Sequence, residues 1–181
     1  MALVVHEWRP GKETAVTWSL MALPLLVVGL VLFSIPVLLH QAERRAMGIG
    51  FGDVLAVLAI TLLLFVLHEA IHGLVMLVFG ARPRFGLTLV GNMLPAFYAT
   101  APGQQFARAQ YLAVAAAPMV VISLGGFIAG FSDAGGYLVL PLAVHLSGCV
   151  GDAAMIRMIL RQPGGTLYED LADGIRFFRP V

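Results

Sequence analysis

The chain carries very little charge for its length. Only 12% of its 181 residues are Asp, Glu, Lys or Arg, whereas a soluble domain carries about 25%. Hydrophobic residues make up 60% of the sequence, and the mean hydropathy is +0.92. This composition is typical of an integral membrane protein. It leaves little room for a separate soluble domain, so we expect a single membrane domain over residues 1–181.

The sequence also lacks the features that indicate several other classes of protein. The net charge is only +1, so no basic field points to a nucleic-acid partner. Cys149 is the only cysteine, which excludes an intrachain disulfide. The eight methionines do not cluster at one depth, so we interpret them as core filler rather than a copper site. The first apolar run is too long for a signal-peptide core, and we expect it to be a retained span.

What the chain has instead is four apolar segments, each with the roughly 20 residues that a membrane-spanning helix needs. They cover residues 16–39, 53–79, 110–131 and 137–160. Pro24 and Pro36 should kink the first segment. The third is rich in alanine and glycine, which let helices approach closely in lipid. We therefore predict an all-α membrane protein with a four-span transmembrane helical bundle.

The loop over residues 80–109 is more than a connector. Residues 84–90 are β-prone, Gly91-Asn92 is typical of a turn, and residues 93–100 form a second extended piece. This pattern predicts a short β-hairpin or re-entrant loop between the second and third spans.

The C-terminal tail, residues 166–179, has apolar residues at helical spacing with acidic residues between them. This pattern predicts an amphipathic helix lying at the membrane interface. The apolar positions are Leu167, Leu171, Ile175 and Phe178.

The distribution of basic residues predicts the orientation of the chain. With four spans, both termini and the middle loop lie on one side, which carries nine Lys and Arg residues. The other side carries only Arg44 and Arg45. Basic residues concentrate in cytoplasmic loops, so we expect a multi-pass protein with both termini in the cytoplasm.

The pentapeptide His68-Glu69-Ala70-Ile71-His72 lies inside the second apolar segment. Ionisable groups are costly in hydrocarbon and mark functional sites there. Residues four apart share a helix face, so both imidazoles can reach one ion. Glu69 lies beside them, where it can handle the proton of a metal-activated water. The pattern predicts a zinc site within the membrane, with Glu69 as a catalytic residue.

A catalytic zinc usually has three protein ligands, and the fourth segment offers His145 and Asp152 for the third. The second and fourth segments should run in the same direction. At 1.5 Å per residue, His72 and Asp152 both lie about 12 Å from the cytoplasmic end, His68 about 18 Å and His145 about 22 Å. We therefore predict that His68, His72 and Asp152 bind the metal. Two imidazoles and a carboxylate suit zinc.

The remaining polar residues of the fourth segment have several interpretations. His145 is expected to be catalytic, either by supporting a ligand or by donating to the oxyanion formed in hydrolysis, with a fourth ligand or a packing residue as alternatives. The alternatives for Asp152 are a helix-packing hydrogen bond or a proton-relay acid. Cys149 is interpreted as a small buried apolar residue.

Together these stretches resemble a family of small integral membrane proteins described as zincin peptidases, distantly similar to site-2 proteases. The resemblance covers about residues 55–178 and includes residues 67–73, 96–103, 116–118, 145–152 and 170–175. It implies zinc bound by His68 and His72, a catalytic Glu69, and Asp152 as third ligand. Site-2 proteases typically carry Asn-Pro and Leu-Asp-Gly in their second motif, and here only the acid of that pattern is present, at Asp152.

We therefore predict an intramembrane zinc metalloprotease that acts on peptide bonds of membrane-bound or membrane-adjacent substrates. Its partners would then be membrane lipid and a membrane protein or peptide substrate. Two other functions fit the same residues: a metal or proton transporter, and a catalytically idle zinc-binding scaffold.

Overall fold

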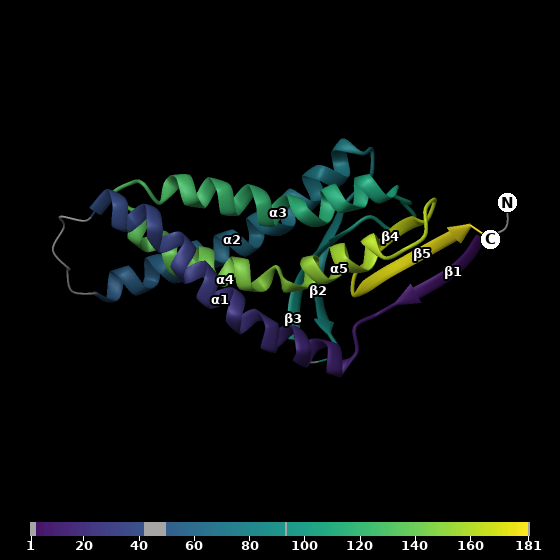
Figure 1. Ribbon diagram of the computed structural model, residues 1–181, viewed down its shortest axis with the longest axis horizontal. Helices are drawn as coiled ribbons and strands as arrows, with labels where there is room; N and C mark the ends of the chain where they lie inside the picture. Colours follow the sequence, from purple (N-terminus) through teal and green to yellow (C-terminus); the bar gives the residue numbers. More distant parts are fainter. Residues whose placement is uncertain (1–2, 42–49, 93, 181) are drawn as a thin grey trace. The chain divides into compact units, whose positions relative to one another are not determined.

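The computed structural model describes residues 3–41, 50–92 and 94–180. The described chain is mostly helical, with two small antiparallel sheets (Figure 1). In chain order, the elements are β1 (Leu3–Trp8), α1 (Lys12–Gln41), α2 (Phe51–Val78), β2 (Arg84–Val90), β3 (Leu94–Thr100), α3 (Arg108–Ala129), the 3-10 helix η1 (Gly135–Leu138), α4 (Val139–Gly148), α5 (Val150–Leu160), β4 (Leu167–Leu171) and β5 (Gly174–Pro180).

Four helical segments are long and apolar enough to cross a membrane, close to the predicted boundaries. They are Lys12–His40, Phe51–Val78, Arg108–Ala129 and Gly135–Leu160. Large apolar side chains stand exposed along them, for example Leu20 at 63%, Leu62 at 63% and Ile128 at 70%. Continuous apolar surface of this kind suits contact with lipid tails. The orientation stays a prediction, since Arg44 and Arg45 lie outside the described residues.

The chain divides into two compact units, each built from several separate stretches of sequence. The first unit contains Met1–Ser19, Glu69–Pro118 and Gly151–Val181, and the second contains Leu20–His68 and Met119–Val150. All of the strands belong to the first unit, and the second is helical. That the whole chain acts as a single domain stays a prediction.

A three-stranded sheet in the first unit joins the two ends of the chain. Its order is β1-β5-β4, and Leu3 of β1 pairs with Pro180 of β5 (Figure 1). This pairing agrees with the even number of apolar helices that are long enough to be spans. Behind the sheet lies a buried apolar cluster that includes Met76, Ala101, Phe106, Tyr111, Val114, Ile159, Tyr168, Ile175 and Phe177.

The predicted interfacial helix over residues 166–179 is wrong, because this tail forms the hairpin β4–β5. The burial of its side chains follows the two-residue period of a strand: Ile175 and Phe177 are buried and Arg176 between them is not. A Cβ on Gly174 would lie only 2.2 Å from the Trp8 carbonyl oxygen. Because glycine has no Cβ, β1 can approach closely here. The strand partner comes from the N-terminus, and local spacing could not reveal it.

The hairpin predicted between the second and third spans is confirmed. Strands β2 and β3 pair antiparallel, with Arg84 opposite Thr100 and Val90 opposite Leu94. Gly91 and Asn92 both have φ of 59°, the positive values that such turns favour. The hairpin packs on α2 at Gly73, where a Cβ would lie 2.5 Å from the Phe85 ring.

Helices of the second unit approach closely at small residues. A Cβ on Gly29 of α1 would lie 2.8 Å from the Cα of Ala143 in α4, and one on Gly126 of α3 would lie 2.3 Å from a Leu142 methyl carbon. Small residues at such crossings allow helices to pack without a hydrophobic driving force between them. The fourth span is two helices rather than one, since α4 ends at Gly148 and α5 begins at Val150, with Cys149 between them.

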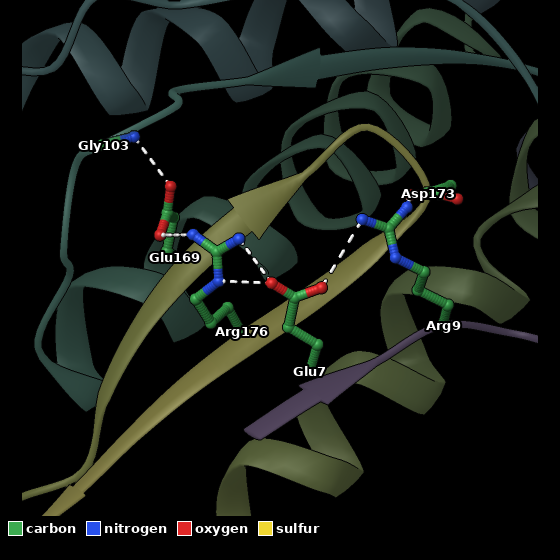
Figure 2. Close-up of polar contacts among 6 residues, drawn as sticks. All are labelled: Glu7, Arg9, Gly103, Glu169, Asp173 and Arg176. Atoms are coloured by element: carbon green, nitrogen blue, oxygen red, sulfur yellow. Dashed lines mark hydrogen bonds and ion pairs between the residues drawn. The ribbon is translucent and has the colours of Figure 1, made fainter. Parts of the chain in front are cut away.

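A chain of charged contacts crosses the three-stranded sheet (Figure 2). Glu169 is 5% exposed; it accepts from the Gly103 N–H at 2.7 Å and pairs with Arg176 Nη1 at 2.7 Å. Arg176 also donates to the more exposed Glu7, which lies 3.6 Å from Arg9, and Arg9 pairs with Asp173. The hydrogen bond from Arg176 lowers the pKa of Glu7. These pairs fix the register of strands separated by most of the sequence.

The two carboxylates that Arg176 contacts differ in burial and offer a matched test. Replacing Glu169→Leu removes the buried carboxylate that accepts from the Gly103 N–H and from Arg176, and losing hydrogen bonds to a charged group should cost about 1.5–3 kcal/mol of unfolding free energy. Glu7→Gln should cost far less, because an exposed pair competes with water. Thermal unfolding in detergent micelles measures both. Equal losses for the two variants would contradict this account.

Candidate metal centre

Helix α2 carries His68, Glu69 and His72 within one continuous stretch of helix. His72 is buried at 8% exposure, while His68 and Glu69 are partly buried. Glu69 and His72 belong to the first unit and His68 to the second. The four-residue spacing puts the two imidazoles one helical turn apart on the same face of α2.

Within the first unit, the structure brings His72 and Asp152 together from α2 and α5. His72 Nε2 lies 3.5 Å from Asp152 Oδ1, and their side chains are 10% and 20% exposed. The two residues are 80 positions apart, and the sequence predicted their common depth from residue counting alone. A nitrogen and a carboxylate oxygen at this separation can either form an ion pair or share a cation.

The orientation of the His72 ring is fixed by the backbone of α3. Nδ1–H of His72 donates to the Val114 carbonyl oxygen at 2.8 Å. Since a carbonyl only accepts, Nδ1 carries the proton and Nε2 faces Asp152. The residue four positions after Val114 is Pro118, which has no N–H. The proline therefore leaves the Val114 carbonyl available to the histidine.

A partly buried acid of the first unit, Asp170 in β4, is a candidate that the sequence pattern did not indicate. It accepts a hydrogen bond from the Tyr111 hydroxyl, and its backbone oxygen accepts from Thr100 at 2.5 Å. Burial raises the pKa of Asp170 to about 7, against the opposing effects of Tyr111 and His72. The acidic residues of the tail had suggested the solvated face of a helix. The strand arrangement instead leaves this one partly buried, in contact with Tyr111.

Within the second unit, His68 meets two residues of the fourth span. His68 Nδ1 lies 3.0 Å from His145 Nε2, and Cys149 Sγ lies 3.8 Å from the same His145 nitrogen. One ligand atom from each of the three residues lies within 4.8 Å of those of the other two, so the group could hold a metal ion. His145 is 2% exposed and Cys149 is 1% exposed.

Cys149 is the candidate ligand that sequence reasoning missed. The signal was present, because His145 and Cys149 are four residues apart, the same spacing as His68 and His72. The single cysteine was instead interpreted as a small apolar residue. His145, predicted to be catalytic, lies beside His68, and its role in catalysis stays a prediction.

The chain belongs to the family described as "Putative zincin peptidase", whose model matches residues 61–167. This match covers more than half of the chain and includes His68, Glu69, His72, His145, Cys149 and Asp152. No curated protein and no solved structure matched the chain. The likeness to site-2 proteases stays a prediction.

The role of Pro118 can be tested through His72. Pro118→Ala supplies a backbone N–H that competes for the Val114 carbonyl, so the hydrogen bond from His72 should weaken. The proton chemical shift of the His72 Nδ1–H in isotopically labelled protein measures this, and it should move to lower frequency. Pro24→Ala, another proline inside a helix, is the control and should leave the signal in place. An unchanged His72 signal in Pro118→Ala would contradict the assignment.

Proposed function

We propose that this protein is a zinc metallopeptidase embedded in the membrane, and that it hydrolyses peptide bonds of membrane-bound or membrane-adjacent substrates. Family membership supports the reaction class. The four apolar helices support the location. The observation that carries the proposal is the pair formed by the buried His72 and the partly buried Asp152, whose side chains lie 3.5 Å apart, with Glu69 about one helical turn before His72 on α2.

The donor set of this pair fits a zinc ion. The Val114 carbonyl holds the proton on Nδ1 of His72, which leaves Nε2 as the nitrogen that would bind the metal. Metal-binding histidines commonly donate their other N–H to a carbonyl in this way. Asp152 supplies an oxygen, and its burial would be costly without a cation or a protonated partner. His68, one turn before His72 on α2, is our proposed third ligand.

When bound, zinc supplies a polarised scissile carbonyl and a more acidic water. The remaining steps belong to the chain's own residues. Glu69 accepts the proton of the attacking water and later returns it to the leaving amine. His72 and Asp152 keep their positions through the Val114 carbonyl and the packing of α5. The surrounding apolar residues exclude bulk water, which strengthens each electrostatic interaction.

The peptidase proposal predicts a clear separation of binding from catalysis. Glu69→Gln should retain metal and reduce cleavage by about 100- to 10,000-fold, because the side chain loses its basicity while keeping its shape. Cleavage of a library of fluorogenic membrane-spanning peptides in micelles measures turnover, and elemental analysis measures bound zinc. In parallel, His72→Ala and Asp152→Asn should lose zinc.

The same experiment separates the rival functions. Cleavage that survives in Glu69→Gln would refute this mechanism. Zinc bound by the native chain with no turnover on any peptide would indicate a scaffold. Metal movement across proteoliposomes, together with no cleavage, would indicate a transporter.

The β2–β3 hairpin is a candidate surface for the substrate. Among the described residues, β2 pairs with β3 alone, so one edge of β2 is open to another strand. Phe85, Leu87 and Leu89 on one face of β2 are 57%, 67% and 53% exposed. An extended substrate segment pairing with this edge would present an unwound peptide bond. Phe85 also contacts α2 at Gly73, next to His72.

Proline substitutions test this edge. Proline at Leu87, Thr88 and Leu89 in turn removes N–H groups that point alternately toward β3 and away from it. Proline at a position whose N–H faces β3 should lower the unfolding temperature. Proline at a position whose N–H faces outward should preserve stability and reduce cleavage by about tenfold or more, because a backbone hydrogen bond to substrate is lost. If stable proline variants cleave as well as the native chain, the substrate does not bind at this edge.

We also propose that both termini lie in the cytoplasm. The support is the excess of Lys and Arg on the side that contains β1, the β2–β3 hairpin and the β4–β5 hairpin.

A further inference from the structure

We propose that His68, His145 and Cys149 form a second metal position, a thiolate site for zinc or a similar thiophilic divalent ion. Its ligand set adds His145 and Cys149, and it shares only His68 with the set that we propose around His72 and Asp152. It lies entirely within the second unit, which contains all three residues. The proposal does not depend on peptidase activity.

Two of the three distances between the donor atoms are close to those around a tetrahedral ion, and all three atoms lie within 4.8 Å of one another. With Zn–N near 2.05 Å and Zn–S near 2.3 Å, two nitrogen ligands should be about 3.3 Å apart and a nitrogen and a sulfur about 3.6 Å apart. The observed separations are 3.0 Å between His68 Nδ1 and His145 Nε2, and 3.8 Å between His145 Nε2 and Cys149 Sγ. Small shifts of the side chains would bring both to the expected values.

The local backbone explains why these residues meet. His145 and Cys149 are four residues apart at the end of α4, so their side chains lie on one face. Helix α4 stops at Gly148, and Cys149 adopts φ −70° and ψ 5° before α5 begins. A Cβ on Gly148 would lie 3.8 Å from the Phe65 ring, an ordinary van der Waals distance, so α2 and the end of α4 are neighbours at this level.

The chemistry of the site differs from that of His72 and Asp152. A thiolate and two imidazoles form a softer donor set than imidazole and carboxylate, and favour zinc, cobalt or cadmium over magnesium or calcium. Without a metal, the Cys149 thiol has an acceptor in the His145 carbonyl, 3.3 Å away. Metal binding would replace the thiol proton and release it. His68 contributes Nδ1 here. Because a neutral imidazole has only one nitrogen free of a proton, His68 would have to lose its remaining ring proton to bind a second ion through Nε2.

Cobalt is a direct probe of this site, because Cys149 is the only cysteine in the chain. Any near-ultraviolet absorption from thiolate-to-cobalt charge transfer must come from Cys149. The full-length protein in detergent micelles is stripped of metal and titrated with Co²⁺ alone. We expect the charge-transfer band in the native chain and in His72→Ala. Cys149→Ser should lose it, and His145→Ala should weaken the cobalt affinity at least about tenfold, the loss that even an outer partner of a metal ligand can cause.

Three results would overturn the proposal. One is cobalt bound with ligand-field bands but no thiolate band. Another is a thiolate band that persists unchanged in His145→Ala, or in His145→Gln if the alanine variant fails to fold. The third is a band lost in a folded His72→Ala, which would mean a single ion shared with His72. Failure of the peptidase proposal would instead appear as missing cleavage with the thiolate band intact, so the two failures are distinguishable.

Discussion

The hydrogen bond from His72 to the Val114 carbonyl is the contact on which the candidate metal centre depends. It joins a histidine of α2 to the backbone of α3, and it exists because Pro118 cannot donate to that carbonyl. A helix-disrupting residue in the third span thereby fixes which nitrogen of His72 faces Asp152. A buried imidazole without this constraint could rotate or change tautomer, and either change would remove the nitrogen from the site.

Polar groups are costly to bury in an apolar span, and in the described structure these groups have polar partners close by. His72 has a carbonyl on one nitrogen and a carboxylate near the other. His68 has His145, which in turn lies near Cys149. Both histidines come from α2, and their nearest partners Val114, Asp152 and His145 come from α3, α5 and α4. The same contacts that satisfy the ionisable groups therefore also hold together the helices of each unit.

The small sheets position the first unit around the candidate site. The hairpin β2–β3 packs on α2 beside His72 through the contact of Phe85 with Gly73. The sheet β1-β5-β4 closes the apolar cluster that contains Val114, the acceptor of the His72 hydrogen bond. The charged contacts of Glu169, Arg176 and Glu7 keep the two chain ends in register. The helices alone would leave this side of the unit open.

The sequence by itself determined the four apolar helices, the hairpin over residues 84–100 and the His68-Glu69-His72 pattern, because each is encoded by neighbouring residues through length, turn chemistry or helical spacing. Tertiary structure decided the rest. Residues 174–180 form a strand by pairing with β1, more than 160 residues away, and residues 167–171 by pairing with β5, despite the helical spacing of the tail. The approach of α4 to His68 gave Cys149 metal-binding neighbours. Contacts between distant segments supply hydrogen-bond partners and burial that no local pattern contains. These contacts determined the C-terminal fold and brought the second set of ligands together.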